Sequence, residues 1–288
     1  MRYEQIICYE VLARRPQAPI ESDPFHRYVL EDGSDWTAFY RTNNGYLLRF
    51  PDLADFLVSA DGKDVTAFPS EETDISTLEH LYINQLVPLA LSRQGLPAFH
   101  ASVVTVPGGA IAFLGRSGTG KSTLAASFAL EGSAFLTDDG LLLEETENGY
   151  MALPSHASLR LWDDSVEALV DYELEHAGPV SYSDKSRLLA GEALSYCNEA
   201  RPLLAAFLLD STKAESFLIS DLDGSNRYRA WLENSFLLDI EDQALLAEHF
   251  DWTHRISSTV PTYKLDYPRD FCMLPEVRRC IGAEVAQV

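Results

Sequence analysis

The stretch Gly115-Arg116-Ser117-Gly118-Thr119-Gly120-Lys121-Ser122 decides how the rest of this chain is interpreted. It is a complete G-x-x-x-x-G-K-[ST] pattern, in which glycines let the backbone approach phosphate groups and turn successive N–H groups toward them. The apolar run Ala110–Leu114 precedes it, and the spacing predicts a helix over Lys121–Leu130. This strand, loop and helix order is what phosphate binding at a helix N-terminus requires. A chance match in a chain of this length is expected in about one sequence in a hundred.

The stretch therefore predicts a P-loop that binds the phosphates of ATP. Lys121 is expected to reach the β- and γ-phosphate oxygens, and the Ser122 hydroxyl is expected to bind Mg²⁺. The predicted nucleotide contacts run from Gly115 through Thr123. No residue is identified that recognises the base, and Trp162, Trp231 and Trp252 are expected to pack in the core or at its rim.

A P-loop enzyme needs a further carboxylate at the end of a strand, and two candidates compete. Asp138 and Asp139 follow the short predicted strand Ala134–Thr137, directly after the P-loop helix. Asp210 follows the continuous apolar run Leu203–Leu209, which is typical of a central strand buried on both faces. We favour the adjacent pair, because one carboxylate can hold the metal while the other takes a proton from an attacking hydroxyl. Asp210 and a solvated Asp-Asp-Gly turn remain the alternatives.

These residues carry a resemblance. His100-Ala101-Ser102, the P-loop with its strand, and Thr137-Asp138-Asp139 resemble the core of the HPr kinase/phosphorylase family over roughly Phe99–Glu145. The resemblance implies an α/β fold whose P-loop core sheet is flanked by helices, with ATP and Mg²⁺ as cofactors.

The same resemblance assigns four roles. His100 matches the active-site histidine, Asp139 the base for the serine hydroxyl, Lys121 the P-loop lysine and Ser122 a Mg²⁺ ligand; Asp138 is the second predicted metal ligand. The later Glu-x-Arg-Gly signature of the family is not recognisable, and its nearest counterpart is Leu159-Arg160-Leu161-Trp162. Arg160, like Lys185 and Arg187, is a candidate cation for charge that develops in the transition state.

By its layout the whole chain resembles the shorter HPr-kinase-related proteins that accompany peptide-modification systems, among them the lasso-peptide kinases. This likeness implies that the phosphoryl acceptor is a serine of a peptide or small protein, such as a lasso-type precursor peptide. Two alternatives stay open: a kinase for a small molecule such as free serine, and a regulator that binds ATP without transferring phosphate.

Composition excludes several other classes of protein. The chain has 22 basic and 44 acidic residues, a formal net charge of −22, so it repels nucleic-acid backbones. No apolar run approaches the roughly 20 residues of a membrane-spanning helix, and Met1–Arg15 lacks the apolar segment of a signal peptide. The four cysteines are scattered, as in a cytoplasmic protein. A homo-oligomer is compatible with these features.

The predicted organisation is a small β-rich N-terminal domain over 1–75 and a P-loop kinase domain over 76–288. In the first part, strands are predicted over Tyr46–Phe50, Asp55–Ser59 and Val65–Phe68. A helix is then predicted to start at the capping box Ser76-x-x-Glu79 and to kink at Pro88, because proline removes a backbone hydrogen bond.

Overall fold

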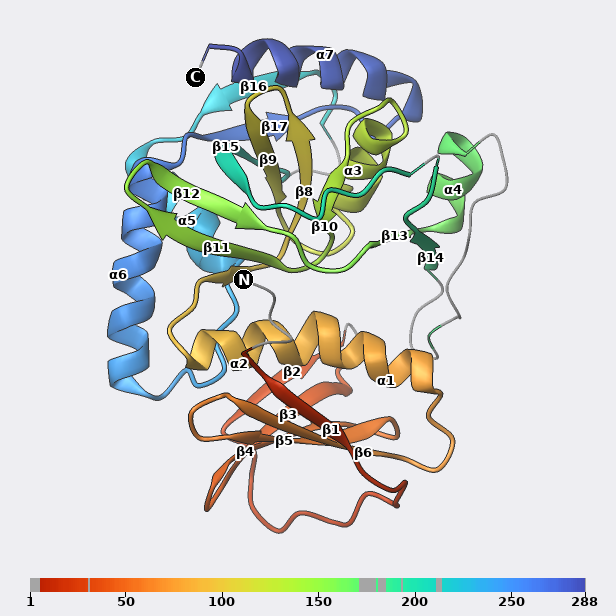
Figure 1. The fold of residues 1–288 in the computed structure, drawn as a ribbon, viewed down its shortest axis with the longest axis vertical. Coiled ribbons are helices and arrows are strands. Elements are labelled where there is room, and N and C mark those ends of the chain that lie inside the picture. Colours follow the sequence, from red (N-terminus) through yellow and green to blue (C-terminus); the bar gives the residue numbers. More distant parts are fainter. Residues whose placement is uncertain are drawn as a thin grey trace. The chain divides into compact units, whose positions relative to one another are not determined.

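The computed structural model describes residues 6–30, 32–170, 180, 185–192, 194–210 and 214–287. The chain forms two compact units (Figure 1). Unit 1 contains Met1–Leu96 with the short segments Pro179–Ser183 and Leu237–Leu246, and unit 2 contains Pro97–Gly178, Asp184–Phe236 and Ala247–Val288. The chain is mixed α/β, as predicted.

Unit 1 is built on a six-stranded sheet in the order β1-β6-β5-β4-β3-β2. Its central strands alternate between buried and less buried residues, for example Tyr46, Leu48 and Phe50 on one face of β4. This alternation is the signature of a sheet with one face packed on a core. The three strands predicted from the sequence in this part are confirmed. The strands are β1 (Cys8–Val11), β2 (His26–Val29), β3 (Asp35–Thr42), β4 (Gly45–Phe50), β5 (Ala54–Ser59) and β6 (Asp64–Pro69).

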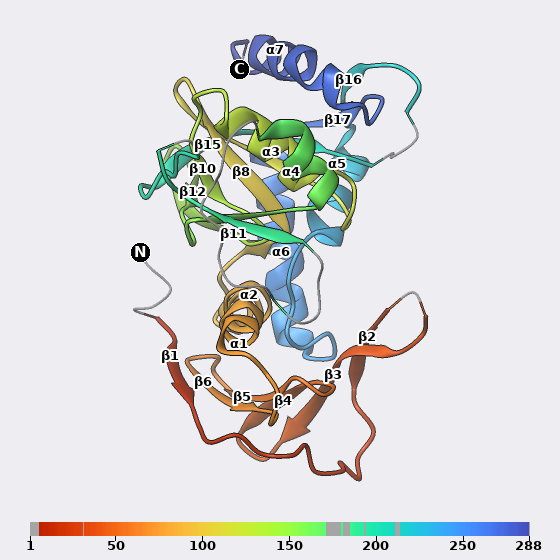
Figure 2. The same cartoon turned by 90° about the vertical axis from the view of Figure 1, so that its right-hand side faces the viewer.

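Three consecutive helical segments follow the sheet and run along one of its faces (Figures 1 and 2): α1 (Ile75–Leu81), the π-helical turn η2 (Tyr82–Leu86) and α2 (Val87–Arg93). The N-cap residue of α1 is Asp74, so the predicted start at Ser76 is wrong by two residues. Pro88 does not kink a continuous α-helix. It lies in the first turn of α2, where its missing N–H costs little, and the π-helical turn precedes it.

Unit 1 continues to Leu96, so the boundary in the structure follows these helices instead of preceding them at residue 75. The helices bury Leu78, Leu81, Leu86 and Leu89 almost completely, each with no more than 2% exposure. The contacts of these helices place them in unit 1 and not in the P-loop part of the chain.

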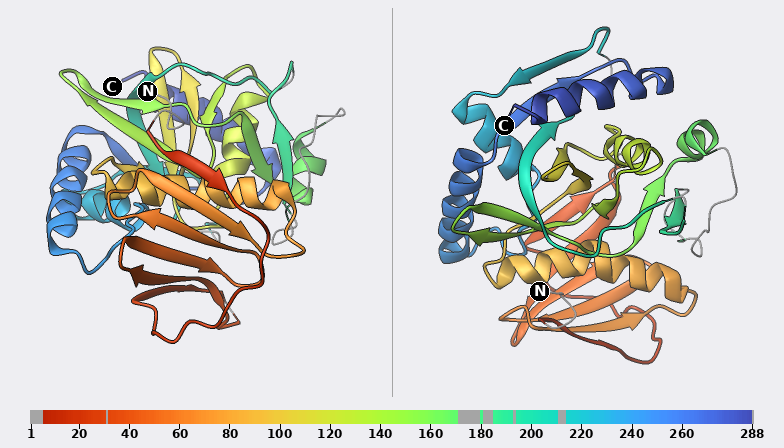
Figure 3. Two further views of the ribbon diagram at one scale, coloured as in Figure 1. Left: turned by 60° about the horizontal axis from the view of Figure 1, so that its bottom comes forward. Right: turned by 45° about the horizontal axis from the view of Figure 1, so that its top comes forward.

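Unit 2 contains a nine-stranded sheet in the order β10-β8-β9-β15-β12-β11-β7, with β17 also paired to β15 and β16 paired to β17. The hairpin of β11 and β12 lies beside the first half of β15 (Figure 3). β9, β15 and β17 are parallel neighbours, so the prediction that Leu203–Leu209 forms a central strand is confirmed. The strands are β7 (Ala98–Phe99), β8 (Ala101–Val106), β9 (Gly109–Leu114), β10 (Phe135–Thr137), β11 (Leu141–Thr146), β12 (Gly149–Leu153), β15 (Arg201–Leu208), β16 (Leu218–Asp221) and β17 (Thr262–Asp266).

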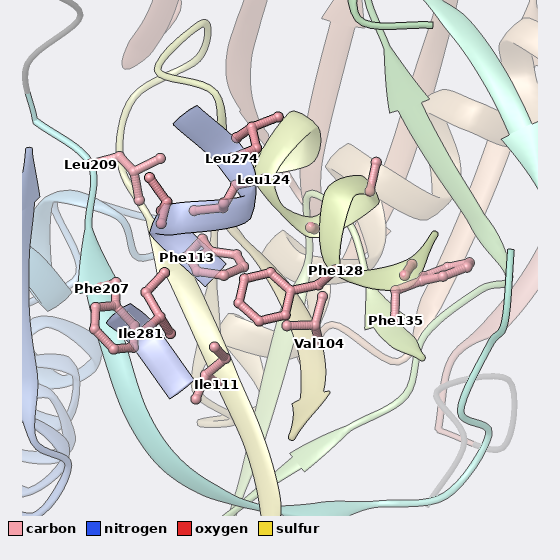
Figure 4. Close-up of a cluster of buried hydrophobic side chains, with 14 of the residues drawn as sticks. Val104, Ile111, Phe113, Leu124, Phe128, Phe135, Phe207, Leu209, Leu274 and Ile281 are labelled. Carbon is pink, nitrogen blue, oxygen red and sulfur yellow. The ribbon is translucent and has the colours of Figure 1, made fainter. Parts of the chain in front are cut away.

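Helices cover both faces of this sheet, and alternate residues of β9 therefore pack into two separate cores. Ile111 and Phe113 pack in one core with residues of α3 (Lys121–Ala129) and α7 (Leu274–Val285), and Figure 4 shows part of this cluster. Ala112 and Leu114 belong to the other core, with Trp231 of α5 (Gly224–Glu233) and Trp252 of α6 (Gln243–Thr259). The covering of both faces explains the continuous apolar runs in these strands.

A two-stranded sheet completes unit 2. It pairs β13 (Ser158–Leu161) with β14 (Ser186–Leu189), and Arg160 lies directly opposite Arg187. The short helices α4 (Asp163–Leu169) and η3 (Phe271–Met273) follow β13 and precede α7, respectively. Among the described residues, none of the helices has the length and apolar character needed to cross a membrane.

Candidate functional site

The predicted site residues meet at one edge of the unit 2 sheet. The parallel strands β9, β15 and β17 end at this edge, and β10 ends there as well because it is antiparallel to β8, which is itself antiparallel to β9. The P-loop follows β9, Asp138 and Asp139 follow β10, and His100 precedes β8. Ligands of open α/β sheets bind outside the carboxyl ends of their strands. The topology thus gathers segments that are distant in the sequence.

The P-loop connects β9 to α3 and depends on two glycines. Gly115 has a φ of 141°, and a Cβ at this position would lie 2.4 Å from the carbonyl oxygen of Leu209, the residue after the neighbouring strand β15. Gly120 has a φ of 94° and is the N-cap residue of α3. Both positions therefore need glycine, one for close approach and the other for its backbone conformation.

Lys121 is buried at the first position of α3 and points back along the loop. Its Nζ donates to the carbonyl oxygens of Gly115 at 2.7 Å and Arg116 at 2.9 Å. Burial lowers its pKa to about 8, and the negative charges of Asp139 and Asp138 counteract this shift. The ammonium group therefore stays mainly protonated at neutral pH and can neutralise phosphate charge.

A cavity of about 270 Å³ lies beside the loop. Of the predicted site residues, Ser117, Gly118, Gly120, Lys121, Ser122, Thr123, His100, Asp139 and Arg160 line it. Gly115, Arg116, Thr119 and Asp138 do not. Gly115 and Arg116 line a second cavity, and the Thr119 hydroxyl is turned into the loop, where it donates to the Arg116 carbonyl at 2.8 Å.

Asp138 is almost fully buried and accepts three hydrogen bonds. Its Oδ1 receives the hydroxyls of Ser102 at 2.5 Å and Ser122 at 2.9 Å, and its Oδ2 receives the backbone N–H of Arg160 at 3.0 Å. Burial and the neighbouring charge of Asp139 nevertheless raise its pKa. A nearby cation favours the ionised form of a carboxyl group in this environment.

Ser122 and Asp138 suit Mg²⁺ in donor chemistry and in spacing. Two adjacent ligands of an octahedral Mg²⁺ ion, each at 2.0–2.1 Å, lie about 2.9 Å apart, and the Ser122 Oγ to Asp138 Oδ1 distance is 2.9 Å. Within the described part of the chain, no group of three or more His, Cys, Asp or Glu side chains could hold a metal ion. Mg²⁺ in nucleotide sites takes its other ligands from phosphate and water, so the residues present fit this ion.

Asp139 has a left-handed backbone with a φ of 69°. The turn that contains it is closed by the Thr137 hydroxyl, which donates to the Gly140 carbonyl at 2.7 Å. Its carboxylate lies 3.7 Å from the Arg160 guanidinium and 3.9 Å from the His100 imidazole. Burial raises the pKa of Asp139, but the positive charges around it, including Lys185 and Lys121, lower it to about 2. Asp139 is therefore ionised at neutral pH.

His100 contacts the same turn through its ring. Its Nδ1 lies 3.2 Å from the Asp139 carbonyl oxygen, and because a carbonyl can only accept, Nδ1 carries the proton. Burial and the charge of Lys121 lower the His100 pKa to about 4, so the ring is neutral at pH 7 with its lone pair on Nε2.

Asn234, at the end of α5, was not identified from the sequence. Its Oδ1 accepts from the Gly115 N–H at 3.0 Å, and its backbone oxygen accepts from the His100 N–H at 2.6 Å. Its amide also donates to the Ala230 carbonyl at 2.8 Å. One buried residue thus fixes the start of the P-loop and the start of β8. Nothing in the local sequence could have indicated this, because Asn234 is more than a hundred residues from either partner.

Asp210, the competing candidate, is also at the end of a strand but in a different environment. Its side chain is 65% exposed, lies 4.0 Å from Lys264, and lines the second cavity instead of the one beside Lys121. The structure places Asp138, and not Asp210, in contact with the P-loop serine.

The aromatic residues of the cavity were also missed. Trp162, Tyr267 and Phe271 line it, together with Arg269 and Leu274. Trp162 does not pack in the core, because it is 47% exposed and lines the cavity, whereas Trp231 and Trp252 are buried in the core.

Comparisons with known proteins give little that bears on this site. No protein-family model and no curated protein matches the chain. Among solved structures, the chain is similar to the HPr(Ser) kinase/phosphatase from Coxiella burnetii, with 15% sequence identity, a TM-score of 0.25, and coverage of 56% of this chain and 97% of that one. This low TM-score leaves the geometry of the site as the basis for a function.

Proposed function

We propose that the chain is an ATP- and Mg²⁺-dependent kinase that transfers the γ-phosphate to a hydroxyl group. One observation carries the proposal: the Asp139 carboxylate lines the same cavity as Lys121 and Ser122 of the P-loop. A regulator that only binds nucleotide needs the loop but has no use for a proton acceptor beside it. A kinase needs both, because the attacking hydroxyl must lose its proton.

The residues divide the chemistry between them. Asp139 accepts the proton of the acceptor hydroxyl while that oxygen attacks the γ-phosphorus, and the bond from the γ-phosphorus to the β–γ bridging oxygen breaks to leave ADP. Lys121 and Arg160 supply positive charge where negative charge develops. His100 holds the turn that contains Asp139, because its ring Nδ1–H donates to the Asp139 carbonyl oxygen. Mg²⁺, held by Ser122 and Asp138, would screen the phosphate oxygens from the incoming hydroxyl.

The acceptor we propose is a serine of a peptide or small protein, such as a lasso-type precursor peptide. This part of the proposal is supported by the resemblance of the whole chain, in its layout, to the shorter HPr-kinase-related proteins that accompany peptide-modification systems. The cavity geometry supports transfer to a hydroxyl in general.

Radiolabelled ATP tests the proposal. The protein is incubated with γ-³²P-ATP, Mg²⁺ and either serine-containing peptides or free serine, and both ADP and labelled acceptor are measured. We expect acceptor-dependent ADP formation that Lys121→Ala abolishes and Asp210→Asn preserves, since Asp210 lies outside the cavity. Tight ATP binding without transfer to any acceptor would contradict the kinase and favour the regulator. Transfer to free serine alone would contradict the peptide acceptor.

A further inference from the structure

The aromatic residues beside the P-loop form a group that the proposed chemistry does not use. A Cβ built on Gly120 would lie 3.8 Å from the Tyr267 hydroxyl and 4.0 Å from Cδ of Arg269. The segment that follows β17 therefore passes directly over the last glycine of the loop. Phe271 and Leu274 continue the same wall of the cavity.

Arg269 presents a planar cation in this wall. Its guanidinium carbon lies 4.0 Å from the centroid of the Tyr267 ring, a stacking contact that fixes the orientation of the guanidinium plane. Tyr267 is itself buried with 2% exposure and packs in the core beside α7. A rigid aromatic residue thus supports a flat, charged group next to the phosphate loop.

Trp162 enters the cavity from another element. It is the N-cap residue of α4, and α4 is tied to α3 because the Thr123 hydroxyl lies 3.1 Å from the Ser165 hydroxyl. Trp162 is 47% exposed, although most large apolar side chains of the unit 2 cores are buried. An exposed indole in a cavity provides a stacking surface for a flat ring.

We propose that Trp162, Phe271 and Arg269 form a nucleobase site, which receives the base of the nucleotide whose phosphates the P-loop holds. The inference rests on the proposed function in one respect, that the loop binds a nucleoside triphosphate. Thr123 contacts α4 and Gly120 lies next to Tyr267, so the wall of this site adjoins the N-terminus of α3, where the phosphates would lie. Aromatic and guanidinium surfaces are the groups on which nucleobases stack.

A ligand without a base separates this role from a structural one. Binding of Mg²⁺-ATP and of Mg²⁺-tripolyphosphate is measured by calorimetry for the wild-type protein, Trp162→Ala and Phe271→Ala. We expect wild type to bind ATP more tightly than tripolyphosphate. Each variant should weaken ATP binding by about tenfold or more and leave tripolyphosphate binding unchanged, since stacking contributes only to the base.

Two further variants guard against misfolding and general effects. Phe250→Ala removes an equally exposed aromatic residue (45%) of α6 that does not line the cavity, and it should alter neither affinity. Trp162→Phe should keep most of the ATP affinity and lose the tryptophan fluorescence change that ATP causes in the wild type.

Equal losses for both ligands, or equal wild-type affinities for both, would overturn the base site. The expected binding pattern without any phosphoryl transfer would overturn the proposed kinase function and still support the base site. Failure of the wild-type protein to bind either ligand would overturn both.

Discussion

Buried carboxylates are held differently in the two units of this chain. In unit 1, Asp55 accepts two hydrogen bonds from Arg49, at 2.8 and 2.7 Å. Asp239 accepts one from Arg41 at 2.6 Å and one from the Tyr46 hydroxyl at 3.0 Å. In unit 2, the Arg160 guanidinium lies 3.7 Å from the Asp139 carboxylate, and the neutral His100 ring lies 3.9 Å from it. Contact pairs neutralise each other and leave no room for a ligand. Under the proposed function, the wider spacing around Asp139 keeps charge available for phosphate and hydroxyl groups.

The difference separates a structural charge from a functional one by geometry alone. A carboxylate whose removal costs stability should differ from one whose removal costs activity, and the variants below test this division. They are ordered from the largest expected effect to the smallest.

Asp139→Asn should give the largest loss of activity. Asparagine keeps the size of the side chain but cannot accept a proton, so phosphoryl transfer should fall by roughly 10²–10⁴-fold, the usual contribution of a general base. The affinity for Mg²⁺-ATP should stay near that of the wild type, and so should the melting temperature. Steady-state kinetics and calorimetry on the same preparation measure all three. A transfer rate within a factor of three of wild type would contradict the role of Asp139.

Arg49→Met should show the opposite pattern. It leaves Asp55, whose side chain is 6% exposed, without its bidentate partner, and breaking such a buried pair costs about 3 kcal/mol. The free energy of unfolding, measured with urea, should fall by that amount while kcat of the folded protein is unchanged. Arg27→Met is the matched control, because its pair with Asp35 is 3.4 Å long and Arg27 is 49% exposed. Equal losses of unfolding free energy in Arg49→Met and Arg27→Met would contradict a special role for the buried contact pair.

The sequence predicted the site better than its surroundings. The P-loop and the Asp138-Asp139 pair are local patterns, and their structure follows from short-range rules: glycine at positive φ, a helix after the loop, carboxylates at a strand end. Asn234, Tyr267 and Arg269 approach the loop only through long-range contacts: β17 pairs with β15, which pairs with β9, and Asn234 at the end of α5 bonds Gly115. No local pattern encodes such contacts.

The lack of local signals for long-range contacts also explains why the boundary predicted at residue 75 differs from the one in the structure. The sequence predicts a helix in this region, and helical segments lie there from Ile75 to Arg93, but helical periodicity does not say which core receives the apolar face. Leu78, Leu81 and Leu86 are fully or almost fully buried within unit 1. The choice between Asp210 and the pair was likewise open in the sequence, since both follow apolar strands. The structure distinguishes them, because Ser122 contacts Asp138 while Asp210 is 65% exposed and lines the second cavity.

Asp138→Asn should affect the metal more than the chemistry. The amide oxygen can still accept from Ser102 and Ser122, but the amide nitrogen cannot accept from the Arg160 N–H, and the side chain lacks the negative charge that attracts Mg²⁺. Loss of even a group that only orients a ligand typically lowers metal affinity by about 10–100-fold, so we expect loss of the charge on a ligand to lower it at least this much. The Mg²⁺ concentration for half-maximal rate should rise accordingly, and added Mg²⁺ should restore part of the activity. A loss that no Mg²⁺ concentration restores would assign Asp138 a role in proton transfer instead.

Asn234→Ala should weaken nucleotide binding by about tenfold. It leaves the buried Gly115 N–H without its acceptor, and an unsatisfied buried donor costs roughly 1–3 kcal/mol. Because this donor belongs to the P-loop, we expect KM for ATP to rise more than kcat falls. Asn226→Ala is the control, since Asn226 is an exposed residue of the same helix that bonds Asp223. Equal changes in the two variants would contradict a positioning role for Asn234.

The smallest expected effect concerns the pH dependence of stability. Burial raises the pKa of Asp239, but hydrogen bonds from the Glu241 N–H, Arg41 and Tyr46 outweigh it and leave the pKa below the ordinary 3.8. A depressed pKa means that the unfolded chain binds the proton first. The contribution of Asp239 is therefore complete above about pH 5 and is lost as the pH falls through 3.8 and below.

Asp239→Asn isolates this contribution from that of the other carboxylates. The variant should unfold at a lower urea concentration than wild type at pH 7, and this difference should be constant down to about pH 5. Below pH 4 the two proteins should approach the same free energy of unfolding. The difference should shrink by at most about 1.4 kcal/mol per pH unit, because one proton is involved. Transfer activity at pH 7 should not change, since Asp239 belongs to unit 1 and its side-chain partners among the described residues are Arg41 and Tyr46. A difference that persists unchanged at pH 3 would show that Asp239 stabilises unit 1 by packing and not through its charge.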